Sequence, residues 1–195
     1  NIDDITISAG ATTGTVSFTP TDDSIYDAAS NETATISING VSGKTGVEEN
    51  STPQTVTITI TDNESAPTVT LATASTSIDE NSASTITLTA TVSTATFQDV
   101  TVSIDGTGGT GTEGTDFGTV SDITISAGST TGTATFDPTD DSVYEGNETA
   151  TISINGVSGK TGVEENSTPQ AVTITITDNE SAPTVTLATA STSID

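Results

Sequence analysis

The chain has 195 residues, of which 27 are Asp or Glu and two are Lys or Arg, so its formal net charge is −25. It contains no His and no Cys, which excludes Ser-His-Asp and Cys-His nucleophile pairs, zinc or haem held by these residues, and disulfide bonds. Two cationic side chains cannot form a nucleic-acid footprint, and no apolar run approaches the roughly 18–20 residues of a membrane helix.

The distribution of apolar residues decides between a disordered and a folded chain. A hydrophobic content of 30% with high net charge is typical of disorder. However, only 15% of the residues are charged, and the apolar residues alternate with Thr and Ser, as in TVTITIT (55–61) and TATISI (149–154). This period of two is typical of strands with one buried face, and branching at Cβ suits Thr and Val to the pleat. The sequence therefore predicts a folded, all-β protein.

From residue 65 onward, the alternating segments predict about seven strands separated by turn-forming sequences. The expected strands are 68–74, 84–93, 98–104, 119–126, 131–137, 148–155 and 170–178. Short strands at this spacing are typical of a β-sandwich. Its core would be thin and built from small side chains, so bound ions would help to stabilise it. The Gly-rich segment 106–118 is expected to be a flexible loop.

The sequence is a tandem repeat. Residues 31–79 recur at 147–195 with one change, and residues 4–26 recur at 122–144 with five changes. A repeat is thus about 116 residues long, the size of a domain. The expected division is 1–64 as the C-terminal part of one repeat, 65–180 as a complete repeat, and 181–195 as the first strand of the next. This division predicts an array within a longer protein, with neighbouring repeats abutting across the short linker at 61–68.

Acidic residues of the complete repeat gather in its loops. They are Glu80, Asp116, Asp140, Asp141, Glu145, Glu148 and Asp178. In a Greek-key sandwich, strand ends from distant parts of the chain meet at one pole, and a hard cation there needs six to eight oxygen ligands at about 2.3–2.6 Å. Carboxylates that gather without a cation repel one another. The pattern predicts a divalent-cation site whose occupancy is coupled to folding.

Five segments of the repeat carry a family pattern. They are PTVTLATASTSIDEN (67–81), GTDF (114–117), ISAGSTTGTATF (125–136), DDSVYEGNETATISI (140–154) and AVTITITDNE (171–180). In these segments the chain resembles Calx-β domains, the calcium-binding modules of sodium–calcium exchangers, integrin β4 and giant bacterial surface proteins. The resemblance covers 65–180 and both flanking pieces. It implies an immunoglobulin-like Greek-key sandwich that binds Ca²⁺.

The resemblance also implies which residues are calcium ligands. Glu80 matches the early acidic ligand, Asp116 the ligand after the third strand, and Asp178 the first residue of the acidic run that ends the domain. Exchanger domains have three aspartates in that run, whereas this chain has Asp178, Asn179 and Glu180, so about one to three ions are expected. The other implied ligands are Asp140, Asp141, Glu145 and Glu148 in the complete repeat, and Asp22, Asp23 and Asp62 in the first partial repeat.

Solvated surface charge is the alternative interpretation of the acidic loops, because such loops also occur in repeats that have lost their ligands and in halophilic proteins. Acids outside the matching positions are expected to serve solubility. They include Glu48, Glu49, Glu164 and Glu165.

The sequence does not contain a complete enzyme motif. The segment GVSGKTG (156–162) lacks the first glycine of a phosphate-binding loop, since Ile154 occupies that position. Paired carboxylates without sugar-stacking aromatics do not indicate a glycosidase, so no enzyme is expected.

These features predict a calcium-stiffened structural repeat, either an extender or the body of a filament, of a long secreted cell-surface protein. Its partners would be neighbouring repeats of the same chain and other copies in a surface assembly, without nucleic acid and without a membrane span in this segment. Two further hypotheses stay open. One is an adhesive module that acts by multivalency; the other is a calcium-sensing domain, which identical tandem copies disfavour.

Overall fold

A computed structural model describes residues 2–26, 32–50, 54–166, 170–190 and 193. The chain divides into two compact units. Unit 1 contains residues 1–24 and 30–63, and unit 2 contains residues 25–29 and 64–195. Every regular element of the described residues is a β-strand, and these residues include no helix long and apolar enough to cross a membrane.

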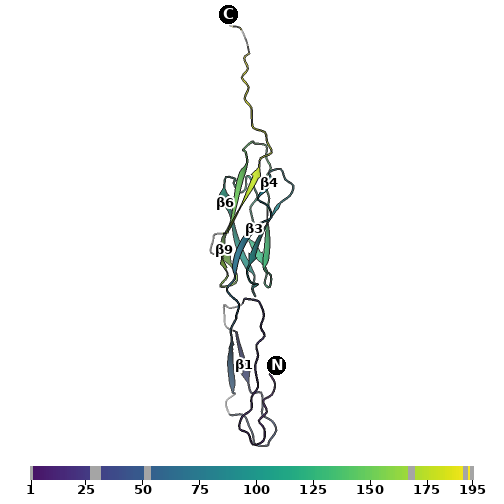
Figure 1. Cartoon of the computed structure of the whole chain (residues 1–195), viewed down its shortest axis with the longest axis vertical. Coiled ribbons are helices and arrows are strands. Elements are labelled where there is room, and N and C mark those ends of the chain that lie inside the picture. Colours follow the sequence, from purple (N-terminus) through teal and green to yellow (C-terminus); the bar gives the residue numbers. More distant parts are fainter. Residues whose placement is uncertain (1, 27–31, 51–53, 167–169, 191–192, 194–195) are drawn as a thin grey trace. The chain divides into compact units, whose positions relative to one another are not determined.

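Unit 2 is a sandwich of two β-sheets that face each other (Figure 1). The first sheet has the order β10 (Glu164–Glu165), β3 (Thr68–Thr73), β5 (Ile86–Val92) and β8 (Thr131–Phe136). The second has the order β4 (Ser77–Asp79), β11 (Ala171–Thr177), β9 (Glu148–Ser158), β6 (Val100–Gly109) and β7 (Ile123–Ile125). All the strands predicted within 65–180 are present, so the prediction of an all-β sandwich is confirmed, whereas the described residues of 181–195, expected to form the first strand of the next repeat, are not in a strand. The strand expected at 119–126 is shorter, and β4 and β10 are additional.

The core between the sheets follows the alternation in the sequence. In β5, the side chains of Ile86, Leu88, Ala90 and Val92 are buried, whereas the threonines between them are exposed or half-buried. The other buried strands supply mainly Val and Ile. Phe117 and Phe136 are fully buried, and their ring centroids lie 5.1 Å apart. These two rings are the largest fully buried side chains of the core.

The first strand of the unit divides between the two sheets. β3 pairs antiparallel with β5, whereas β4 pairs in parallel with β11. Side chains close the turn between them: Thr73 Oγ1 donates to the carbonyl of Ser75 at 2.7 Å, and Ser75 Oγ donates to that of Ser77 at 2.9 Å. This switch delivers the chain after β4 to the end of β11.

The Gly-rich segment 106–118 corrects the expectation of a flexible loop, because its first residues continue β6. The pairing of β6 with β9 shifts register between Asp105 and Gly108. Gly109 has φ +104°, and a Cβ there would collide with the carbonyl oxygen of Thr149. Glycine is needed here because β6 approaches β9 too closely for a side chain. After this close contact between β6 and β9, the rest of the Gly-rich segment leads to Asp116.

Unit 1 contains one described pair of strands, β1 (Glu32–Ser37) and β2 (Thr55–Ile60), which run antiparallel. Glu32 lies opposite Ile60, just as Glu148 lies opposite Ile176 in the pairing of β9 with β11. The repeated sequence thus adopts the same strand register in both of its copies.

Candidate metal centre

Strand register at one end of the second sheet brings acidic residues together. Because β4 and β11 run in parallel with Asp79 opposite Thr177, the next residues, Glu80 and Asp178, also lie beside each other. β9 runs antiparallel to β11, so it begins with Glu148 at the same end of the sheet. Residues far apart in the sequence therefore meet at this pole of the unit.

The first carboxylate group consists of Glu80, Asp178 and Glu180, each with one oxygen within 4.8 Å of the others. Glu80 is buried, and its Oε1 accepts a hydrogen bond from the backbone N–H of Asp141 at 3.0 Å. Oε2 of Glu180 is also buried, and it has no hydrogen-bond partner among the described residues. Desolvation raises the pKa of Glu180, and hydrogen bonding to Asp178 and repulsion by Glu80 raise this pKa further. A buried carboxylate oxygen without a hydrogen-bond donor is suited to be the ligand of a cation.

Asp178 connects the first carboxylate group to the loop that carries Glu145. Its Oδ2 accepts hydrogen bonds from the backbone N–H groups of Glu145, at 2.9 Å, and Gly146, while its Oδ1 accepts one from Glu180 at 2.8 Å. Desolvation opposes ionisation of Asp178, but these backbone donors outweigh it and lower the pKa of this carboxyl below its usual value. Asp178 is therefore a carboxylate at neutral pH, held in place by the backbone on both sides.

The second carboxylate group consists of Asp116, Glu145 and Glu148, again with one oxygen of each within 4.8 Å of the others. Oδ2 of Asp116 accepts a hydrogen bond from the backbone N–H of Thr112, which fixes Asp116 in its turn. Desolvation raises the pKa of Glu148, followed by the charge and hydrogen bonding of Asp116. Desolvation also raises the pKa of Glu145, followed by repulsion from Asp116 and other nearby carboxylates. The protein thus holds these acids together against their mutual repulsion.

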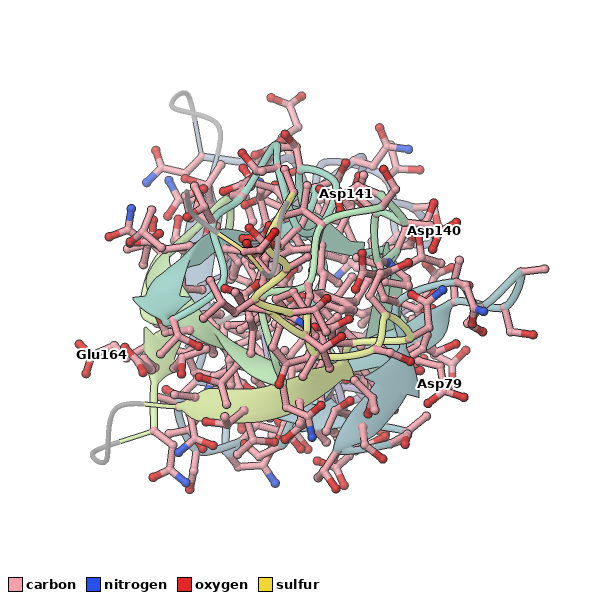
Figure 2. The ribbon with its side chains drawn as sticks, turned by 90° about the horizontal axis from the view of Figure 1, so that it is seen from above. Asp79, Asp140, Asp141 and Glu164 are labelled. Atoms are coloured by element: carbon pink, nitrogen blue, oxygen red, sulfur yellow. The ribbon has the colours of Figure 1, made fainter. Side chains whose placement is uncertain are left out.

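The predicted ligands Asp140 and Asp141 lie on the loop beside these groups but belong to neither of them (Figure 2). Oδ1 of Asp141 accepts a hydrogen bond from the backbone N–H of Val143 at 2.6 Å, which closes the turn. The charges of Asp140 and Asp141 contribute to the raised pKa values of Glu180 and Glu145, respectively. Their observed roles are to shape the loop and to add negative charge to the pole.

The predicted ligands of unit 1 are not gathered in the same way. Asp22 and Asp23 are exposed and Asp62 is half-buried, and these three do not form a three-carboxylate group in the part of unit 1 that the structure describes. The partial repeat pairs β1 with β2, but its described residues contain no counterpart of the strand switch that places Glu80 beside Asp178.

Two acids outside the pole have a local structural role. Oε1 of Glu165 accepts a hydrogen bond from the backbone N–H of Gln170 at 2.6 Å, and Oε1 of the equivalent Glu49 accepts one from Gln54 at 3.0 Å. Each carboxylate therefore binds the backbone of the Gln that lies five residues after it. The neighbouring Glu164 projects outward from unit 2, away from Asp140 and Asp141 (Figure 2).

The two carboxylate groups offer the donor type that Ca²⁺ prefers, because all their side-chain ligands are oxygens. The chain has only two cationic side chains, Lys44 and Lys160, so a metal ion is the simplest counter-charge for six clustered acids. Glu80, Asp116, Glu145, Glu148 and Asp178 are predicted ligands that belong to these groups. Glu180 was missed by the predicted set, and the available signal was its position two residues after Asp178.

The fold and these groups define a class of protein, an all-β sandwich domain with an acidic pole that could bind a metal. The LapA domain family matches residues 66–179, more than half of the chain, and the chain belongs to this family. This family is not a family of enzymes, and membership of it indicates a cell-surface role related to bacterial adhesins.

Two solved structures are similar to the chain at low sequence identity. The apo form of the Calx CBD1 domain has 20% identity and a TM-score of 0.47, and the match covers 57% of this chain and 98% of that one. CBD12 from CALX1.2 has 22% identity and a TM-score of 0.45, with 53% of this chain and 41% of that one covered. The chain thus spans less than half the length of the second structure. No curated protein matches the sequence.

Proposed function

We propose that the chain is a calcium-stiffened structural repeat, an extender or filament body, of a long secreted cell-surface protein. The observation that carries this proposal is the pair of three-carboxylate groups at one pole of unit 2. Membership of the LapA domain family supports the surface location. The protein performs no catalysis, and its partners are neighbouring repeats and other copies in a surface assembly.

Charge repulsion explains how calcium would stiffen the repeat. Without a cation, burial and like charge raise the pKa values of Glu145, Glu148 and Glu180, so folding must hold these groups in an unfavourable arrangement. A divalent ion held by Glu80, Asp178 and Glu180, or by Asp116, Glu145 and Glu148, would reverse the sign of that interaction. The loops after β4, β6 and β11 and the loop before β9 would then be tied together. Binding that favours the folded state stabilises it in proportion to ligand concentration.

The repeated sequence supports the extender part of the proposal. Residues 65–180 would form one domain, with 1–64 and 181–195 belonging to its two neighbours in an array. Each complete copy would carry its own acidic pole, so calcium would stiffen the array once per repeat. The net charge of −25 adds repulsion between copies, which favours an extended chain. At physiological salt this repulsion acts over about 8 Å and is largely screened at longer distances.

The test is calcium binding to the 195-residue chain by titration calorimetry, with Glu180→Gln as the site variant and Glu164→Gln as the matched control. Gln keeps the size of the side chain but removes the charged ligand. The wild type and the control should bind Ca²⁺ alike, whereas Glu180→Gln should weaken binding by about tenfold or more. Equal binding by all three proteins, or no binding by any of them, would refute the assignment.

A second variant separates the two groups. Glu148→Gln removes a ligand of the second group and leaves Glu80, Asp178 and Glu180 intact. If both groups bind calcium, this variant should lose one class of sites and retain the other. Small-angle scattering of the wild type in calcium and in chelator then tests stiffening, for which a smaller spread of conformations is expected with calcium.

A further inference from the structure

The two tyrosines of the chain occupy equivalent positions in the repeated sequence but lie in different environments. Because 4–26 recurs at 122–144, Ile25 and Tyr26 correspond to Val143 and Tyr144. Tyr26 belongs to unit 2 and is 7% exposed, whereas Tyr144 is 46% exposed and Val143 is 56% exposed. The local sequences are nearly the same, so the surroundings must account for the difference.

Tyr26 is held in unit 2 by both its backbone and its ring. Its N–H donates to the carbonyl of Ala95 at 2.8 Å, and it forms a parallel β-bridge with Thr96. Nζ of Lys160 lies 5.8 Å from the centroid of the Tyr26 ring, within the range of a cation–π interaction. Gly162 has φ +88°, and a Cβ there would lie 2.5 Å from the Tyr26 hydroxyl oxygen. We call the surface formed by Ala95, Thr96, Lys160 and Gly162 the tyrosine socket.

The tyrosine socket is built into the fold of unit 2. Thr96 is fully buried, its Oγ1 donates to the carbonyl of Gln98 at 2.6 Å, and its own carbonyl accepts from Gly128 at 2.8 Å. Lys160 is 8% exposed, which is unusual for lysine and indicates that its stem packs while its ammonium group faces the aromatic ring. The hydrogen bonds of Thr96 to Gln98 and Gly128 are made within unit 2 and do not involve Tyr26.

The partial repeat shows half of the same socket without a tyrosine. Lys44 and Gly46 are the sequence equivalents of Lys160 and Gly162. Lys44 is exposed, and a Cβ at Gly46 would meet open space. The chain thus contains a socket with its tyrosine, a tyrosine outside a socket, and a half-socket without a tyrosine.

We propose that Val143 and Tyr144 form a docking element that binds the tyrosine socket of a second copy of the repeat unit. The occupant follows from the molecule itself, because Tyr26, the sequence equivalent of Tyr144, already occupies this socket in unit 2. The docking element and the socket are different surfaces of one unit, so the contact is heterologous and can continue from copy to copy. The partner of this surface is therefore another LapA-type repeat of the same sequence. This proposal does not depend on calcium.

Tyrosine fluorescence tests the proposal directly because the chain has no Trp and only two Tyr. Tyr26→Phe and Tyr144→Phe each leave one emitting residue in the 195-residue chain. Acrylamide should quench Tyr144 several-fold more strongly than Tyr26. Equal quenching of the two residues would mean that the socket does not protect its tyrosine, and it would overturn the proposal.

The decisive measurement adds a second socket. A longer chain, in which residues 80–180 of the same sequence follow Asp195, supplies a complete repeat after Tyr144. With every other tyrosine replaced by Phe, the quenching of Tyr144 should fall to the low value of Tyr26. In the matched control, the added copy carries Ala at the position equivalent to Lys160, and the protection of Tyr144 should decrease. Quenching of Tyr144 that is unchanged by the added repeat would refute the proposal.

Discussion

Glu180 shows how one side chain links stability to ion binding. One of its carboxylate oxygens is buried without a hydrogen-bond partner among the described residues, and the pKa of the group is raised. Such a group destabilises the folded state whenever it is ionised and unpaired. An ion with several oxygen ligands removes this penalty. An unfavourable buried carboxylate in the metal-free protein would therefore be the source of any stabilisation by calcium.

The raised pKa values of Glu145 and Glu148 predict an inverse pH dependence for the calcium-free protein. Because the pKa of each group is higher in the folded than in the unfolded chain, folding takes up protons, and stability should rise as pH falls from about 7 towards about 5. In saturating calcium the direction should reverse, since protons compete with the ion for the same oxygens. Thermal unfolding across this range, with and without chelator, measures both slopes.

Two variants test whether the pH dependence of stability arises at the acidic pole. Glu145→Gln should reduce the slope in chelator, whereas Glu164→Gln, on the exposed β10, should leave it unchanged. A slope of the same size in both variants would mean that the net charge of the whole chain, rather than the pole, causes the effect. Asp178, whose pKa is lowered, would add a loss of stability only at more acidic pH.

The sequence predicted most of the acidic residues at the pole but not their grouping. Glu80 and Asp178 could be selected because they match acidic positions of the family that the sequence resembles. The position of Asp141 was predicted, but its contacts with Val143 and Glu80 were not, because a loop sequence does not show whether a carboxylate turns inward or closes its own turn. Glu180 was missed for the same reason.

At the scale of elements, alternation of Thr with Ile, Leu or Val predicted the long strands well. It could not predict β4, because a strand of three residues is too short to show a period. β4 is nevertheless essential for the site, since its parallel pairing places Asp79 opposite Thr177 and therefore Glu80 beside Asp178. The Gly-rich segment was misinterpreted because glycine indicates either flexibility or close backbone approach, and here β6 uses it for the latter.

The close crossing of β6 and β9 predicts a large effect of a small substitution. Gly109→Ala places a methyl group against the carbonyl of Thr149 at a positive φ, so it should destabilise unit 2 by about 1–3 kcal/mol. Gly118→Ala is the control, because a Cβ there would make an ordinary contact of 3.8 Å with the carbonyl of Asp137. Denaturant unfolding compares the two variants, and an equal effect of both would contradict the proposed role of Gly109.

At the scale of the whole chain, repetition and charge act together. The pairing of β1 with β2 and of β9 with β11 shows that near-identical sequence gives the same register twice. A chain with 27 acidic and two basic residues has little internal means of neutralising its charge. Divalent cations at defined poles would offset part of this charge where it is most concentrated, and they would do so in every complete repeat of an array.

The most direct test of calcium binding is the melting temperature of the 195-residue chain in calcium, in magnesium and in chelator at constant ionic strength. Calcium should raise the melting temperature of unit 2 in a concentration-dependent way. Magnesium should have a smaller effect, because it demands a tighter octahedral site and gives up its water less readily. The same melting temperature in calcium and in chelator would contradict the central claim, since the clustered carboxylates would then be solvated charges without a bound ion.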